Sequence, residues 1–169
     1  MSKLPQLGLR AWTFLWTLLA MALIGNVIAS AFAGNPSVIN YAIFVTLWAM
    51  LTVLVGFVAA FTESLIPAVL LLGMDALAVL FTLTVGIALA AELHAKSCGN
   101  NSYTSSNHLT NGSHNPHKRC QELQASTAFF WFMFAGFAGS VFFDFLGYRS
   151  GGGSSRGGMR KGGPSMSTV

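Results

Sequence analysis

Hydrophobic positions in this chain form four long blocks, and polar segments separate them. The blocks occupy residues 11–33, 41–61, 65–91 and 125–148. A helix rises about 1.5 Å per residue, so about 20 residues cross the roughly 30 Å of bilayer hydrocarbon. Buried strands are much shorter, at about 5 to 6 residues. A cleaved signal peptide is the alternative for the first block, but its apolar core is longer than the usual 7 to about 15 residues. The pattern therefore predicts an all-α membrane protein with four transmembrane helices.

Short polar joints and the placement of basic residues predict how the four helices are arranged. The joints "GNPS" at 34–37 and "TES" at 62–64 are short enough to make an antiparallel bundle. Positive residues favour the cytosolic side, and they are found in the end segments 1–10 and 149–169. We therefore expect both termini in the cytosol and an outer loop at 94–124. The basic residues of that loop weaken this assignment without reversing it.

The outer loop contains both cysteines of the chain, Cys98 and Cys120, one near each end. Disulfides and N-linked sugars belong outside the reducing cytosol, so both features fit the predicted side. We expect a disulfide between the two residues; the alternative is a pair of free thiols. The loop also has two glycosylation sequons, at Asn100 and Asn111. Asn111 is the better acceptor because Asn100 lies close to the membrane, although both sequons also fit chance occurrence.

The last segment, 149–169, is rich in Gly, Ser and Arg and has too few apolar residues to build a core. We expect it to be disordered. Its four basic residues would attract anionic lipids of the inner leaflet if the tail stays near the surface; these are Arg149, Arg156, Arg160 and Lys161. The alternative is a solvated tail with no lipid contact.

Few polar residues fall inside the predicted spans, and each is a functional candidate because burying it is costly. Asp75 lies deepest. No Lys or Arg lies within the four blocks, so we expect a neutral Asp75 carboxyl that hydrogen-bonds Thr52 at matching depth. Asn26 is a weaker candidate of the same kind. Asp144 lies near the end of its span, where we expect it to reach Arg149.

Composition and motifs argue against most chemistry. The chain is 53% hydrophobic and 8% charged, and it lacks the nucleophile, phosphate-loop and metalloprotease motifs of common enzymes. Four histidines in or beside the outer loop have no preorganised ligand spacing, so we assign no metal or cofactor; they are His94, His108, His114 and His117. We expect neither catalysis nor nucleic-acid binding. Small residues four apart in the last span predict a close helix contact, within the chain or with another copy.

Two segments carry a family resemblance. "MDALAVLFTLTVGIALAAELHAKSCGNNSY" at 74–103 and "RCQELQASTAFFWF" at 119–132, with a tail ending in "STV", resemble the MARVEL-domain group and, within it, the fungal non-classical export protein 2 family. The first two helices match only in layout and apolar character. The matching positions are Asp75, Phe81, Thr82, Thr84, Gly86, Cys98 and Cys120.

This resemblance implies a plasma-membrane protein that organises sterol-associated microdomains and eisosome-associated furrows, responds to sphingolipids, and has a disputed link to leaderless protein export. Partners would be sphingolipid, sterol and anionic inner-leaflet lipids, further copies of the chain, and cytosolic scaffold proteins of the eisosome type. Our leading hypothesis is a non-enzymatic membrane organiser. The alternative is a small transporter or export component that uses Asp75 and Asn26 in a polar path.

Overall fold

The computed structural model describes residues 3–32, 34–62, 66–94 and 96–151, and within this part the fold is entirely helical apart from one isolated bridge. Four long helices are each apolar enough to cross a bilayer, as the sequence predicts. They are α1 (Lys3–Ala29), α2 (Ser37–Phe61), α3 (Ala68–Leu93) and α5 (Pro116–Gly151). A short helix, α4 (Asn101–Ser106), lies in the long connection between α3 and α5.

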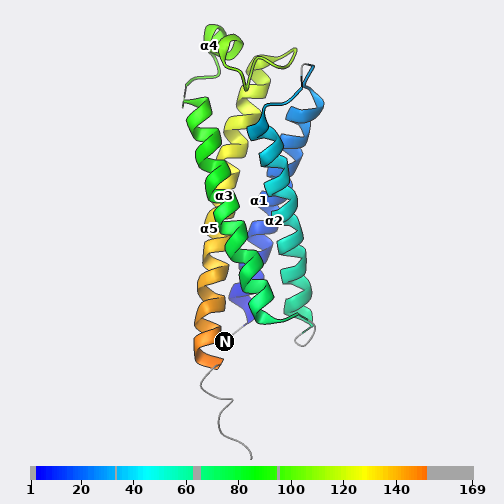
Figure 1. Cartoon of the computed structure of the whole chain (residues 1–169), viewed down its shortest axis with the longest axis vertical. Coiled ribbons are helices and arrows are strands. Elements are labelled where there is room, and N and C mark those ends of the chain that lie inside the picture. The colour runs from blue at the N-terminus through cyan, green and yellow to red at the C-terminus, as the bar shows by residue number, and fades with distance from the viewer. Residues whose placement is uncertain (1–2, 33, 63–65, 95, 152–169) are drawn as a thin grey trace, which may run out of the picture.

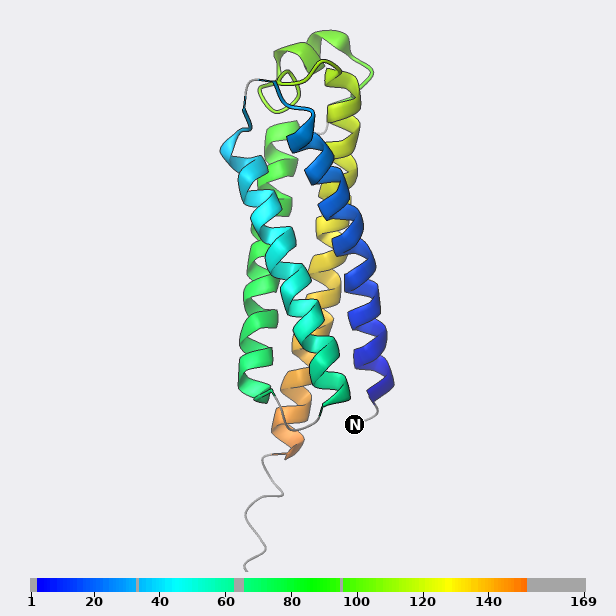
Figure 2. The same cartoon turned by 90° about the vertical axis from the view of Figure 1, so that its right-hand side faces the viewer.

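The long helices form an antiparallel bundle in the order α1, α2, α3, α5, with α5 also packed against α1 so that the ring closes (Figure 1). The first described residues and the end of α5 lie at one end of the bundle, which we call the terminal end. The α4 segment and the turn between α1 and α2 cover the other, which we call the loop end (Figure 2).

The interior of the bundle combines small and large apolar side chains. Ala20, Ala42, Ala49 and Ala78 are fully buried beside larger residues such as Phe130. Close helix approach suits a membrane protein, because lipid is as apolar as leucine and tight packing must hold the helices together. Large apolar side chains also cover the outside of all four helices; examples are Leu18, Leu47, Leu54, Leu80, Ile87 and Phe142. This outer surface is suited to contact with lipid chains.

The small residues of α5 pack inside the chain. A Cβ at Gly136 would lie 2.3 Å from Cγ2 of Thr13, and one at Gly139 would lie 3.3 Å from Leu9, so both glycines face α1. The predicted small-residue contact is therefore one between α5 and α1 of the same molecule.

Helices α1 and α5 extend past their apolar blocks into charged segments. Helix α1 begins at Lys3, and α5 begins at Pro116 and contains Arg119 and Cys120. A charged residue ends an apolar block in the hydropathy pattern. The helix itself continues as long as its inner face packs against neighbouring parts of the bundle. Polar residues that the sequence places outside the bundle therefore lie inside it.

The connection from 94 to 124, which the sequence predicts as an outer loop, is folded onto the bundle. Leu109 and Thr110 are fully buried. The backbone N-H of Phe32 donates to the carbonyl of Gly112 at 3.1 Å, beside a bridge between Ala31 and Ser113. Backbone pairing thus joins the two connections at the loop end.

Candidate functional site

A buried ion pair lies near the terminal end. Nη1 and Nη2 of Arg10 donate to the two carboxylate oxygens of Asp75 at 2.6 and 2.5 Å. Arg10 is 4% exposed and Asp75 is fully buried. This two-pronged geometry is the arrangement in which a guanidinium holds a carboxylate most specifically. The pair fixes α1 against α3.

A second carboxylate lies beside this pair. Oδ2 of Asp144, from α5, is 3.9 Å from Nη2 of Arg10, and Gln6 donates from its side chain to Oδ1 of Asp144. Arg10 and Gln6 lie one helical turn apart on α1 and hold carboxylates from two other helices. We call Gln6, Arg10, Asp75 and Asp144 the terminal cluster.

Helix α2 supplies the space for the arginine. A Cβ at Gly56 would lie 2.4 Å from Nε and 2.6 Å from Cζ of Arg10. Only a residue without a side chain lets the guanidinium pass α2 on its way to Asp75. All four long helices therefore meet at Arg10.

The expectation that Asp75 lacks a charged partner is wrong, and Arg10 is the functional candidate that the sequence reasoning missed. Thr52 is buried, but its hydroxyl donates to the carbonyl of Trp48 in its own helix. Arg10 precedes the first apolar block by one residue, so hydropathy assigns it to the cytosol. The shared depth of the two residues follows only from the observed helix bounds, since Arg10 and Asp75 each lie seven residues after the start of their parallel helices.

The side chain of Arg149 lies outside the described part of the structure, so its expected contact with Asp144 stays a prediction. The carboxylate of Asp144 contacts Gln6 and Arg10. Helix α5 extends to Gly151, so the first residues of the predicted disordered tail are helical. Arg156, Arg160 and Lys161, the other predicted lipid-contacting residues, lie outside the described residues.

Most other polar groups inside the bundle are hydroxyls, and those described donate to carbonyls of their own helices. Such a bond satisfies the hydroxyl without a partner on a facing helix. The donors are Thr17, Thr46, Thr52, Thr82, Ser126 and Ser140. An apolar core layer, including Ile24, Val45, Val85 and Phe130, lies between the terminal cluster and the loop end.

The loop end has its own buried arginine. The guanidinium of Arg119, in α5, is 1% exposed and donates to the carbonyls of Leu109 and Val27 at 2.7 and 2.8 Å and to Oδ1 of Asn35 at 3.1 Å. Val27 lies in the last turn of α1, where backbone carbonyls have no helical partner and the helix dipole is negative. Arg119 thus caps α1 and secures both connections.

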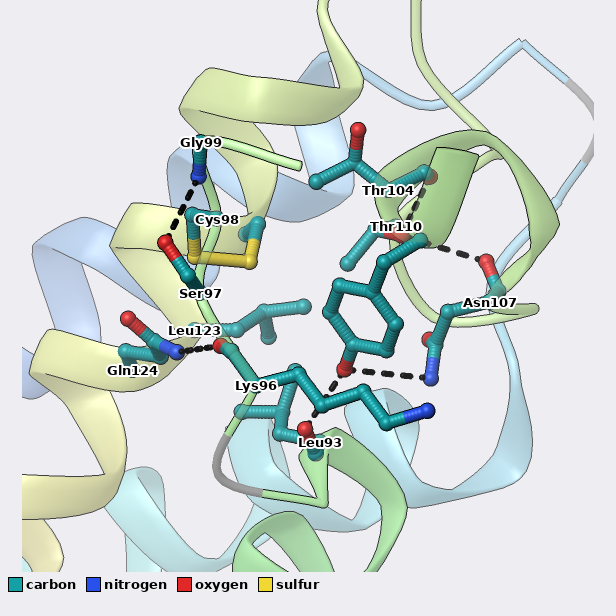
Figure 3. Close-up of a disulfide and its surroundings, with 12 residues drawn as sticks. Leu93, Lys96, Ser97, Cys98, Gly99, Thr104, Asn107, Thr110, Leu123 and Gln124 are labelled. Carbon is teal, nitrogen blue, oxygen red and sulfur yellow. Dashed lines mark hydrogen bonds between the residues drawn. A yellow bond between two sulfur atoms is a disulfide. The ribbon is translucent and has the colours of Figure 1, made fainter. Parts of the chain in front are cut away.

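A disulfide joins Cys98 to Cys120 next to this arginine, as the sequence predicts (Figure 3). Gln124 of α5 adds a bond to the carbonyl of Lys96 at 2.8 Å. The bridge ties the segment after α3 to the first turns of α5.

Tyr103 of α4 covers the end of α3. Its hydroxyl donates to the carbonyl of Leu93 at 2.5 Å (Figure 3). The side chain of Asn107 donates to the carbonyl of Glu92 at 2.9 Å. Both bonds satisfy carbonyls that the helix leaves free at its C-terminus. Burial raises the pKa of the Tyr103 hydroxyl.

Asn26 belongs to the loop end. Its side-chain amide donates to Glu122 of α5 at 2.6 Å, and Lys118 lies 3.6 Å from the same carboxylate. Asn26 and Asp75 therefore lie in separate polar groups at opposite ends, which removes the predicted shared polar path.

The two sequons differ in environment. Asn100 is the N-cap of α4, where its side chain accepts from the backbone N-H of Tyr103 at 3.3 Å. Asn111 is exposed in the turn after α4. This placement is consistent with Asn111 as the better acceptor; glycosylation itself stays a prediction.

Three of the histidines have different structural contacts. His94 is the C-cap of α3, His108 lies 3.7 Å from Glu92, and His114 packs on Phe32 at 5.1 Å between ring centroids. Within the described part of the chain, no three His, Cys, Asp or Glu side chains are grouped to hold a metal ion.

Comparison with known proteins supplies the family. Residues 2–143 match MARVEL, a membrane-associating domain. The chain is similar to Non-classical export protein 2 of Saccharomyces cerevisiae, with 35% identity over 125 residues that cover 73% of this chain and 70% of the relative. It is 34% identical to Non-classical export protein 102 of Candida albicans over 165 residues, 95% of each chain. A Schizosaccharomyces pombe homolog of Non-classical export protein 2 is 33% identical over 79% of this chain and 75% of the relative. No solved structure shows a significant match.

Proposed function

Because this chain belongs to the MARVEL family of membrane-associating domains, we propose that it organises the plasma membrane laterally without catalysing a reaction. In this function the bundle gathers particular lipids and further copies of itself into microdomains. The tail and the terminal end recruit cytosolic scaffold proteins of the eisosome type.

One observation carries the proposal: the buried hydroxyls and charged groups described in the bundle are occupied internally, apart from the indole N-H groups of Trp16 and Trp48, while the outer surface is apolar. The buried hydroxyls bond to their own helices, and Arg10 is neutralised by carboxylates. Large exposed side chains such as Leu47, Leu80 and Phe142 cover the outer faces. A protein built in this way acts through the lipids and the further copies of itself that its outer surface contacts. Small differences in bilayer thickness and lipid charge are enough to sort such a bundle laterally.

The proposed topology places the terminal end in the cytosol and the loop end outside. Basic residues at both ends of the sequence support it. The disulfide at the loop end supports it independently, since such bonds persist outside reducing compartments. The basic tail then faces the anionic inner leaflet, and the sequon at Asn111 faces the compartment where sugars are added.

The test is imaging of the fluorescently tagged full chain in fungal cells. We expect patches in the plasma membrane that disperse when sphingolipid synthesis is blocked. Deletion of 152–169 should reduce scaffold recruitment and leave the multi-pass insertion intact. Uniform fluorescence that ignores sphingolipid depletion contradicts the proposal.

The alternative function is a small transporter or a component of non-classical export, which the names of the relatives suggest. Flux through vesicles reconstituted with the protein separates the two. Proton or solute flux that is lost in Asp75→Asn favours transport. Wild-type vesicles as tight as protein-free ones favour the organiser.

A further inference from the structure

A cavity of about 510 Å³ opens at the loop end, between the last turn of α1, the turn after it, and the first turns of α5. Its volume is in the range of small-ligand sites. It lies where the apolar span of α1 ends, and the end of a span is where lipid headgroups are expected. Residues from both connections and both helices line it, among them Asn26, Phe32, His114, Lys118, Arg119 and Glu122.

The cavity has an excess of positive charge. Arg119 is nine-tenths buried or more, and its recorded acceptors among the described residues are carbonyl and amide oxygens, which do not cancel its charge. A guanidinium also has more N-H donors than these acceptors use. Lys118 adds a second cation. The single carboxylate of the lining, Glu122, contacts Asn26 and Lys118 and also interacts electrostatically with Arg119, so one carboxylate faces two cations.

The cavity lies between two helix ends of opposite dipole, so its preference for an anion rests on the side-chain cations. The dipole is positive at the first turns of α5 and negative at the last turn of α1. A planar guanidinium next to a lysine is suited to phosphate oxygens. The cavity therefore combines a buried cation and an exposed cation around one space.

One rim of the cavity is apolar. Ala29 and Ala31 line it, and Phe32 is 59% exposed beside His114. A free phosphate ion makes no favourable contact with an apolar rim, whereas the glycerol or acyl region of a lipid packs on it. We propose that this cavity binds the phosphate of a lipid headgroup in the leaflet at the loop end. This inference rests on the proposed membrane function and identifies the chemical class of lipid that the bundle collects.

Binding is measured on the full chain purified in a neutral maltoside detergent. The probe is dioctanoyl phosphatidylinositol, with dioctanoylglycerol as the uncharged control and inorganic phosphate as the lipid-free control. The readout is the shift of the melting temperature with ligand concentration, which gives an apparent dissociation constant. We expect saturable stabilisation by the phospholipid and little effect of either control at equal concentration.

Two charge-reversal variants form a matched pair. Lys118→Glu changes an exposed lysine that lines the cavity, and Lys96→Glu changes an exposed lysine of the same end that lies over Tyr103 instead. We expect Lys118→Glu to weaken phospholipid binding about tenfold and Lys96→Glu to change it less than about twofold. Ala29→Trp, which fills the cavity without changing charge, should also weaken it.

Equal effects of the two lysine variants, or equal stabilisation by dioctanoylglycerol, overturn the proposal. Stabilisation by inorganic phosphate as strong as that by the phospholipid assigns the site to free anions and overturns the lipid assignment. Because binding is measured on purified protein, its failure leaves the imaging test untouched. Loss of membrane patches alone, with binding intact, contradicts only the proposed function.

Discussion

Two buried arginines, one at each end of the bundle, are held in opposite ways. Arg10 at the terminal end pairs with the carboxylate of Asp75, while Arg119 at the loop end donates to carbonyls and an amide. Arg10 lies two turns inside α1, where a lone charge is expensive and an opposite charge offsets it. Arg119 lies where helices end and free carbonyls are already present. Depth in the bundle thus decides which partner a buried cation needs.

The difference predicts unequal costs when one partner is removed. Asp75→Leu removes the two-pronged partner of the buried Arg10 guanidinium and leaves only Asp144, at 3.9 Å, so it should lower the free energy of unfolding by about 3 kcal/mol or more. Thermal or denaturant unfolding in detergent micelles measures this change. Leu77→Ala, at an exposed position of the same helix, is the control and should cost much less. A loss below about 1 kcal/mol would mean that water reaches Arg10 freely.

Arg119→Leu should cost less, about 2 to 3 kcal/mol, because it removes the charge together with its hydrogen bonds. The three acceptors lie at the loop end, where water replaces the lost donor. The same unfolding assay compares it directly with Asp75→Leu. A larger loss for Arg119→Leu than for Asp75→Leu contradicts the proposed role of depth.

The disulfide also stabilises the folded connection at the loop end. Replacing Cys98 and Cys120 with serine opens a connection of 22 residues, which should lower stability by about 3 kcal/mol on the chain-entropy model. Because α4 and Arg119 depend on this connection, proteolysis should cut 94–115 faster in the variant. The terminal cluster should be unaffected, so unchanged cleavage there is the internal control.

Gly56→Ala tests the space that Arg10 needs. The added Cβ meets the guanidinium at 2.4 Å, so the side chain must move and stability should fall by about 2 kcal/mol. Gly73→Ala is the matched control, since a Cβ there meets nothing within 4 Å. It should be neutral or slightly stabilising because alanine favours helix. Equal effects at both positions would show that Arg10 does not pass α2 closely.

Tyr103→Phe should have the smallest effect, about 1 kcal/mol, through loss of the bond to Leu93. Burial raises the pKa of this hydroxyl, so the folded state keeps its proton to higher pH than the unfolded state does. Wild-type stability should therefore be complete below the ordinary tyrosine pKa of about 10 and decline above it. The phenylalanine variant should lack this part of the alkaline decline.

How much of the molecule can be predicted from the sequence depends on how far apart in the chain the interacting residues lie. The length of each membrane span can be predicted from local hydropathy alone. The four helices and their antiparallel order therefore follow from the apolar blocks. The pairing of Cys98 with Cys120 follows because they are the two cysteines and share one connection. Asp75 is identified because a carboxylate in an apolar block stands out. Each of these inferences uses residues close together in the chain.

Contacts between distant segments are harder to predict. Arg10 lies 65 residues from Asp75, and Arg119 lies 92 residues from Val27. In both cases a helix continues past the apolar block and carries an arginine inward. Gly56 had a readable signal, since it lies five residues from the end of α2 and thus near the depth of Arg10. The folded connection of 94–124 depends on such pairings and has no local periodicity.

The most direct measurement is a double-mutant cycle on Arg10 and Asp75, using Arg10→Met, Asp75→Leu and the double variant in one unfolding assay. If the two side chains form a buried ion pair, the double variant should be more stable than Asp75→Leu by about 2 kcal/mol or more, because the buried cation that lost its main partner is also removed. Losses that simply add would contradict the pairing and return Asp75 to the candidates for a polar path through the membrane.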